Sequence, residues 1–164
     1  MKRLFFIISA LILFYSCTPD EIPPIGKPFD RKAQLVGTWN LTKFIQTDEN
    51  AKSKDYPSFA VSKDLTTVFP NHPYTDFSLT LKSDGTFTTS VGKSYVDMLP
   101  SGTWALDDPK YPAAIVLTSG TTTQNVTLGS LANLTSGKVS LKILRKTVVK
   151  PTVKVSYEFQ MVKK

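Results

Sequence analysis

The sequence predicts an all-β domain, an eight-stranded antiparallel up-and-down barrel that spans residues 35–164. Short runs of alternating apolar and polar residues, turn signals such as Asp-Gly, and an abundance of Thr, Ser and Val all favour strands. Hydrophobic residues make up 41% and charged residues 20% of the 164 residues, which is typical of a folded domain. An eight-stranded meander can close on itself and has room inside for one small ligand.

Residues 1–16 have the organisation of a lipoprotein signal peptide. Lys2 and Arg3 are followed by the apolar run Leu4–Phe14, which is too short to span a bilayer as a mature helix. A small residue then precedes Cys17, in a pattern that resembles a bacterial lipoprotein signal. The resemblance implies that Cys17 is acylated; the alternative is an ordinary secretory signal followed by a free thiol.

Residues 17–34 are predicted to be the lipidated cysteine and a proline-rich tether. Four prolines between Thr18 and Phe29 keep the segment extended, so that it lifts the domain roughly 35–40 Å from the membrane. More than one acyl chain would make the attachment lasting. Thr18, not Asp, follows the cysteine, which resembles outer-membrane sorting. Asp20-Glu21 faintly resembles a surface-export tag, and periplasmic and cell-surface exposure both remain open.

The first strand is predicted at Leu35–Ile45, after one helical turn at Asp30–Gln34. Leu35, Gly37, Trp39 and Leu41 share one face, and this period of two indicates a half-buried strand. We expect Trp39 to plug one end of the barrel as part of its core.

A connection of about 30 residues, Gln46–Asp76, follows the first strand, and segments of this length are usually lids, Ω-loops or disordered. Its aromatic residues argue against disorder. They are candidate ligand contacts, and the alternative is that they pin the connection to the barrel rim. His72, without neighbouring ligands, is expected to be exposed. The candidate ligand-binding residues are Tyr56, Phe59, Phe69, Tyr74 and Phe77.

The rest of the chain supplies seven more strands and one short irregular or helical piece, Ser130–Gly137. Asp84-Gly85 predicts a tight hairpin turn, because both residues tolerate positive φ. In the last strand Val153, Val155, Tyr157, Phe159 and Met161 share one face and fix the register. The predicted strands are Phe77–Lys82, Phe87–Val91, Ser101–Leu106, Ala114–Thr118, Thr122–Leu128, Lys138–Arg145 and Thr152–Val162.

Three motifs together resemble the lipocalin-like (calycin) family, in particular small lipocalin-like lipoproteins of Bacteroidetes type. They are Val36-Gly37-Thr38-Trp39, the segment L-K-S-D-G-T-F over 81–87, and Gly102-Thr103-Trp104. The likeness covers roughly 35–164 and implies a barrel floor closed by a tryptophan under a basic side chain. Trp39, Trp104 and Arg145 are the candidate floor residues. An immunoglobulin-like β-sandwich is the alternative fold.

Chemistry is constrained by the single cysteine, Cys17, and the single histidine, His72. An intrachain disulfide and a Cys/His metal cluster are excluded, and no nucleophile–base set is visible, so we expect neither an enzyme nor a cofactor. Asp107 and Asp108 are adjacent acids and are interpreted as turn residues. Despite a net charge of +7, nucleic acid is not expected to be a partner of an exported protein.

The sequence therefore predicts a monomeric, membrane-anchored envelope lipoprotein of the outer membrane. It would bind a small hydrophobic or amphipathic ligand in the barrel, under the connection Tyr56–Phe77. The alternative function is that of a filled barrel that docks on an envelope partner or glycan through its loops.

Overall fold

The structure, a computed structural model, describes residues 30–146 and 152–164. The predicted signal peptide, Cys17 and most of the predicted tether lie outside the described residues. Among the described residues, no helix reaches the length and hydropathy that a membrane crossing requires. In this part of the chain nine strands form one antiparallel sheet: β1 (Gly37–Asp48), β2 (Ser62–Asp64), β3 (Ser78–Leu81), β4 (Thr86–Ser90), β5 (Ser101–Leu106), β6 (Ala114–Ser119), β7 (Thr122–Leu128), β8 (Lys138–Lys146) and β9 (Val153–Lys163).

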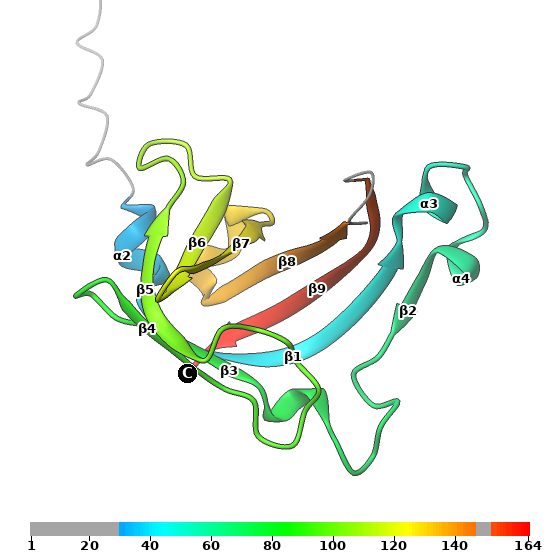
Figure 1. The fold of residues 1–164 in the computed structure, drawn as a ribbon, viewed down its shortest axis with the longest axis horizontal. Helices are drawn as coiled ribbons and strands as arrows, with labels where there is room; N and C mark the ends of the chain where they lie inside the picture. The colour runs from blue at the N-terminus through cyan, green and yellow to red at the C-terminus, as the bar shows by residue number, and fades with distance from the viewer. Residues whose placement is uncertain (1–29, 147–151) are drawn as a thin grey trace, which may run out of the picture.

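The sheet closes into a barrel (Figure 1). β1 and β3 to β9 pair in chain order, and β9 returns to pair with β1 from Trp39–Lys163 to Asp48–Val155. This pairing confirms the eight-stranded up-and-down barrel and rules out the sandwich alternative. β2 is an addition to the eight: it pairs with the last part of β1, where Ile45 lies opposite Asp64.

The strand directions define two ends of the barrel. β1 starts at what we call the floor end, together with the β3–β4 turn and the helix α2 (Arg31–Leu35). β1 finishes at the mouth end, where the connection to β3 carries α3 (Glu49–Lys52), α4 (Ser58–Val61) and the 3-10 helix η1 (Tyr74–Asp76). Figure 1 shows α2 and the α3–α4 segment on opposite sides of the barrel.

The floor end is covered by α2, which lies one residue later than the predicted helical turn. Asp30 caps the helix, because its carboxylate accepts a 2.9 Å hydrogen bond from the Ala33 amide. The carbonyl of Leu35, at the last residue of the helix, accepts a 2.7 Å hydrogen bond from the indole Nε1 of Trp39. The helix is thereby tied to the first inward-facing tryptophan of the barrel.

Both tryptophans of the chain lie at the floor end and are buried: Trp39 is 1% exposed and Trp104 is 3% exposed. Trp104 Nε1 donates to the carbonyl of Lys82 at 2.9 Å. A lysine ammonium lies over each ring: Lys163 Nζ is 5.4 Å from the Trp39 centroid, and Lys32 Nζ is 5.5 Å from that of Trp104. The basic side chain over Trp39 is therefore Lys163, whose Nζ also donates to the Gln34 carbonyl at 2.9 Å.

Side chains fill the barrel between floor and mouth. The inward faces of the strands contribute aliphatic and aromatic residues that pack as one buried cluster. The largest of the side chains below 2% exposure are Trp39, Phe77, Phe87, Phe159, Leu35, Leu79, Leu81, Ile115, Leu117, Leu134, Leu141 and Met161.

A β-bulge in β1 changes which residues face into the barrel, from odd-numbered before the bulge to even-numbered after it. Trp39 and Leu41 face inward opposite Lys163 and Met161, and the register with β9 then shifts between Leu41 and Lys43. Phe44 consequently faces inward, opposite Phe159. Sequence alternation alone placed the even-numbered residues of this strand on the outer face.

The outer face of β9 carries one buried polar residue, Ser156, which the alternating pattern placed among exposed residues. Ser156 is fully buried because α3 packs against this part of the strand. Its Oγ donates a 2.5 Å hydrogen bond to Glu49 Oε1. The buried hydroxyl thus has a charged partner supplied by the helix that covers it.

β7 and β8 are joined only near the floor within the described residues. Thr127 pairs with Lys142 and Leu128 with Leu141, and the strands then diverge toward the mouth. A groove of about 550 Å³ lies at this divergence, and its lining includes Gln124, Ile143 and Arg145. The other neighbouring strands of the barrel pair over three or more residues each.

Two turns are held by aspartates, as their sequence predicts. Asp84 Oδ1 accepts from the hydroxyl and amide of Thr86 at 2.7 and 2.8 Å, and these bonds hold the pKa of Asp84 below its usual range. Asp107 accepts from the amides of Ala114 and Ala113, each at 2.9 Å, and its pKa is lowered for the same reason. The interpretation of Asp107 as a turn residue agrees with these contacts.

Candidate ligand site at the barrel mouth

A pocket of about 150 Å³ opens at the mouth end of the barrel. A cavity of this volume is about large enough for one benzene-sized ring. The lining combines aromatic residues, one aliphatic residue and an oppositely charged pair from five parts of the chain. The lining residues are Phe44, Tyr74, Tyr95, Asp97, Ile143, Arg145, Tyr157 and Phe159.

Phe44 is the centre of the aromatic wall. Its ring is stacked on Tyr157, with centroids 5.5 Å apart and an interplanar angle of 7°. The rings of Tyr74 and Phe159 lie 4.3 and 4.8 Å from it. Such pairs stabilise one another beyond the area they bury, so the wall has a defined shape before any ligand binds.

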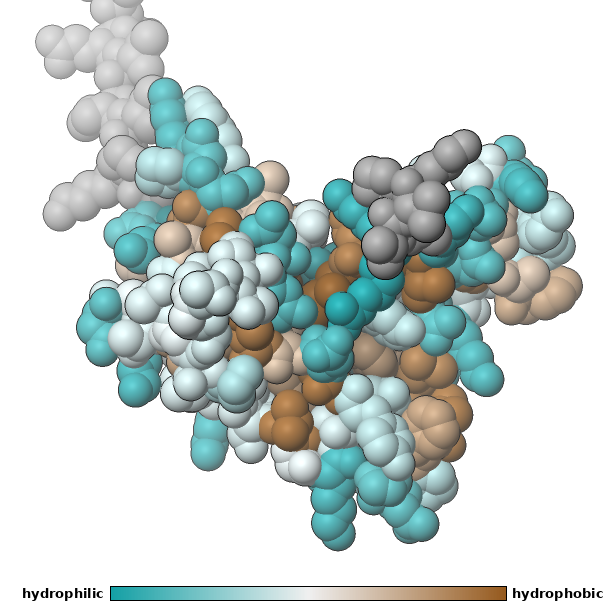
Figure 2. Space-filling model, viewed as in Figure 1, coloured by the Kyte–Doolittle hydropathy of each residue, from teal (hydrophilic) through white to brown (hydrophobic). Residues whose placement is uncertain are grey.

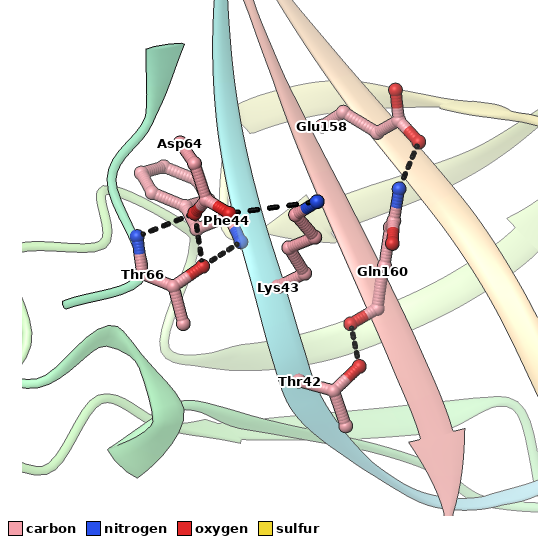
Figure 3. Close-up of polar contacts among 7 residues, drawn as sticks. All are labelled: Thr42, Lys43, Phe44, Asp64, Thr66, Glu158 and Gln160. Carbon is pink, nitrogen blue, oxygen red and sulfur yellow. Dashed lines mark hydrogen bonds and ion pairs between the residues drawn. The ribbon is translucent and has the colours of Figure 1, made fainter.

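The connection between β1 and β3 holds Phe44 in place (Figure 3). The Phe44 amide donates to Thr66 Oγ1 at 2.9 Å, and the Thr66 hydroxyl donates to Asp64 Oδ1 at 2.6 Å. The Thr66 amide also donates to Asp64 Oδ1, at 3.0 Å. The two bonds from Thr66, with the nearby Lys43 ammonium as a weaker cause, lower the pKa of Asp64. The Leu65 amide donates to the Phe44 carbonyl at 2.8 Å. The long connection is therefore pinned to β1 at the residue that lines the pocket.

The bulge that turns Phe44 inward is held from the neighbouring strand. Thr42 Oγ1, at the bulge, donates to the Gln160 carbonyl at 2.9 Å, and Gln160 Nε2 donates to Glu158 Oε1 at 3.2 Å (Figure 3). Lys43 lies on the same side and forms an ion pair of 3.5 Å with Asp64. These polar contacts occupy the outer surface of β1, opposite the pocket.

Residues 91–100, which we call the mouth loop, form the other side of the pocket. Val96 and Met98 are buried in the core cluster, so the loop folds down into the open end of the barrel. Gln124 Oε1 accepts from the Leu99 amide at 3.2 Å, and its Nε2 donates to the Asp97 carbonyl at 3.4 Å. The mouth loop is thus fastened to β7.

Asp97 also fastens the mouth loop to β8. Its carboxylate forms an ion pair with the guanidinium of Arg145, and its carbonyl accepts from the same Nη2 at 3.5 Å. Asp97 therefore bridges Gln124 on β7 and Arg145 on β8, across the place where the two strands diverge. These contacts of Asp97 link β7 to β8 where, over the residues that the structure describes, the two strands have no backbone hydrogen bonds between them.

Tyrosine hydroxyls add polar groups to the aromatic wall. Burial raises the pKa of Tyr74, and the nearby Tyr157 and Tyr95 raise it further. Tyr74 is therefore neutral throughout the physiological pH range, and its hydroxyl can donate a hydrogen bond. A site with an aromatic body and a few polar groups is suited to an amphipathic molecule.

The candidate ligand-binding residues fall into three groups. Tyr74 lines the pocket, and Phe77 lies in the core next to it, with its ring 5.7 Å from Phe159. Phe69 is 43% exposed and contacts Tyr74 and Tyr95 at the rim. Tyr56 and Phe59 lie away from the pocket, at 52% and 86% exposure.

Arg145 requires a correction, because the resemblance assigned it to the barrel floor. It pairs with Val155 near the mouth, whereas Trp39 pairs with Lys163 at the other end of β9. β8 runs from floor to mouth and Arg145 is one of its last residues, which explains the position. His72 also differs from its expected exposure: it is half-buried, with its ring 4.4 Å from that of Tyr95 and its Nδ1 2.8 Å from the Lys93 carbonyl.

Six pocket residues were not among the predicted site residues: Phe44, Tyr95, Asp97, Ile143, Tyr157 and Phe159. Phe44 had a signal, because two polar residues before it break the odd-numbered apolar pattern that runs through Leu41. Tyr95 and Asp97 lie in a loop without periodicity, and their approach to β8 is a tertiary contact. Among the described residues, no three His, Cys, Asp or Glu side chains gather as a metal site would require.

Comparison with known proteins gives one assignment. No curated protein matches the chain. The sequence profile of the family described as Domain of unknown function (DUF5004) matches residues 16–161, which include the whole of the barrel except its last residues. The chain, an eight-stranded antiparallel barrel with a pocket at its mouth, belongs to this family.

Proposed function

We propose that this chain is a lipid-anchored envelope protein with a lipocalin-like barrel, and that it binds a small amphipathic ligand at the barrel mouth. The observation that carries the proposal is the mouth pocket, in which a preformed aromatic wall around Phe44 lies beside the charged pair Arg145–Asp97. Concave, mostly aromatic sites with a few polar groups are typical of small-molecule binding.

The proposal favours a ligand that is small and held near the surface. The core beneath the pocket is filled by residues such as Phe77 and Phe159, so a long hydrocarbon chain has no channel into the described part of the barrel. The pocket volume of about 150 Å³ suits a single ring with a polar substituent. Tyr74 and Tyr157 offer ring faces together with hydroxyls.

Native mass spectrometry of the protein purified from its own host tests ligand carriage. We expect a co-purifying small molecule that raises the mass of the folded protein and is released on unfolding. Host-purified protein that carries no small molecule, and that takes up none from a host metabolite extract, would argue against this function.

The anchor is tested at Cys17. The Cys17→Ala precursor is expected to stay unacylated and to leave the outer-membrane fraction, because the acyl attachment is lost. Fractionation of the variant and of the unaltered chain is followed by immunoblot, with metabolic labelling by palmitate as the direct readout. An unchanged outer-membrane distribution of the variant would refute the anchor.

A second function, docking on an envelope partner or glycan, is supported by exposed aromatic residues at the mouth end. Phe59 is 86% and Tyr56 52% exposed in the α3–α4 segment. Figure 2 shows hydrophobic residues at the surface of this side of the molecule, where Figure 1 places α4. A stoichiometric macromolecular partner in the native spectrum, in place of a small molecule, would favour this second function.

A further inference from the structure

We propose that the ligand of the mouth pocket is a small ring compound with an anionic group, and that this group pairs with Arg145 in place of Asp97. The inference rests on the proposed function, because it names the chemical class of the ligand for the same pocket. Its basis is the position of one arginine, the exposure of its present partner, and the shape of the wall beside it.

Arg145 is a cation on the inward face of a barrel strand. It follows Leu141 and Ile143 at alternate positions of β8, and both of those side chains are buried in the core. Arg145 lines the mouth pocket and also the groove between β7 and β8, as does Ile143. A guanidinium that faces a pocket with aromatic walls is suited to bind a planar anion through paired N–H donors.

Asp97 is a partner that a ligand can replace. The Asp97 side chain is 80% exposed and that of Arg145 45% exposed, and an ion pair so open to water contributes little stability. Asp97 belongs to the mouth loop and not to a strand, and the loop has other attachments. Val96 and Met98 remain buried and Gln124 still binds the Leu99 amide if the carboxylate leaves.

The ring of the ligand would lie against the aromatic wall. Phe44 and Tyr157 are stacked nearly parallel, and Ile143 completes an apolar surface next to Arg145. Tyr74, which keeps its proton, offers a hydroxyl that can donate to an anion, whereas an ionised tyrosine could not. The charged pair and the wall together define a ligand with one apolar face and one negative group.

Benzoate and benzamide are a matched pair of probes, because they differ in charge and hardly in shape. Their affinities for the full-length protein and its variants are compared by isothermal titration calorimetry and ligand-observed NMR. Arg145→Met removes the proposed anchor, and Lys146→Met removes the same charge one residue away. Asp97→Asn removes the competing carboxylate, and Asp55→Asn, on the exposed connection, is its control.

Benzoate is expected to bind more tightly than benzamide. Arg145→Met should weaken benzoate about tenfold and leave benzamide unchanged, since a charge-assisted bond is lost. Asp97→Asn should tighten benzoate roughly threefold, because the exposed pair no longer competes. Lys146→Met and Asp55→Asn should each change the affinity for benzoate by less than about twofold, in keeping with screening at the surface.

The outcomes separate this inference from the function on which it rests. Equal binding of the two probes, with no response to Arg145→Met, overturns the anionic class and leaves a pocket for neutral rings. Weaker benzoate binding in Asp97→Asn overturns the replacement of Asp97. Failure of both probes to bind the unaltered protein overturns the inference and also the mouth pocket as a site for small rings.

Discussion

Replacing Gly102 by alanine is expected to lower the free energy of unfolding by about 3 kcal/mol or more, among the larger effects of a single methyl group. Gly102 has a φ of 153°, and a Cβ built there would lie 1.9 Å from the carbonyl oxygen of Thr118. That oxygen belongs to the backbone of the neighbouring strand β6, so it cannot move aside as a flexible side chain could. The β5–β6 pairing must distort to admit the methyl group.

Gly120→Ala is the matched control, because Gly120 also has a positive φ, 57°. Apart from Gly120 and its two chain neighbours, no described residue has an atom within 4 Å of the position that its methyl group would take. The control is expected to lose only about 1 kcal/mol, the penalty of the left-handed conformation alone. Urea unfolding followed by tryptophan fluorescence measures both variants. Equal losses would show that the close approach at Gly102 carries no energetic consequence.

Phe44→Ala is expected to lower the free energy of unfolding by about 3–5 kcal/mol and to abolish ligand binding at the mouth. The Phe44 side chain is 4% exposed and contacts three aromatic rings, so its removal leaves a cavity and a wall without its central ring. Its amide bond to Thr66 is a backbone contact and survives the substitution. The loss therefore reports ring packing and not detachment of the connection.

Phe59→Ala is the control, because it removes the same aromatic ring from an exposed position instead of a buried one. Phe59 is 86% exposed, so Phe59→Ala should change the stability by no more than about 0.5 kcal/mol and leave ligand binding intact. Chemical unfolding and benzamide titration are run on both variants. A Phe44→Ala protein with near-normal stability would contradict the central place of this ring, and lost binding in Phe59→Ala would move the site to the α3–α4 segment.

Much of the fold could be predicted from the sequence, because turn residues mark where most strands begin and end. Ser101–Leu106 and Thr122–Leu128 were predicted with the limits that β5 and β7 have, since turn residues flank each of them. The limits of the first strand were harder to predict. β1 continues beyond the predicted end at Ile45 to Asp48, because β9 and β2 pair with its last residues. These residues, Gln46–Asp48, are all polar, so they show no hydrophobic period.

The connection from β1 to β3 shows a second limit. Its 3-10 helix η1 brings Tyr74 and then Phe77 to the barrel, which the aromatic composition of the segment indicated in outline. The same composition gave no way to distinguish these two residues from Tyr56 and Phe59, which are exposed. Which aromatic residue is buried depends on where Thr66 and Leu65 attach the connection to Phe44.

The charged part of the site could not be predicted because its two residues come from distant segments. Asp97 lies in a loop without pattern, and Arg145 was assigned to the floor by analogy with other barrels. Strand direction decides the end at which Arg145 lies, and its direction follows once β8 is known to start at the floor. The closing contact of Asp97 depends on the way Val96 and Met98 bury the loop.

Because β7 and β8 diverge, the barrel wall between them is held together in different ways at the floor end and at the mouth end. Near the floor the two strands are joined by backbone pairing, at Thr127–Lys142 and Leu128–Leu141. Near the mouth the seal consists of Gln124, Asp97 and Arg145, whose bonds can be exchanged one at a time. The barrel wall between β7 and β8 is therefore closed by backbone pairing near the floor and by side-chain contacts near the mouth. The contacts near the mouth can open without a change in strand register.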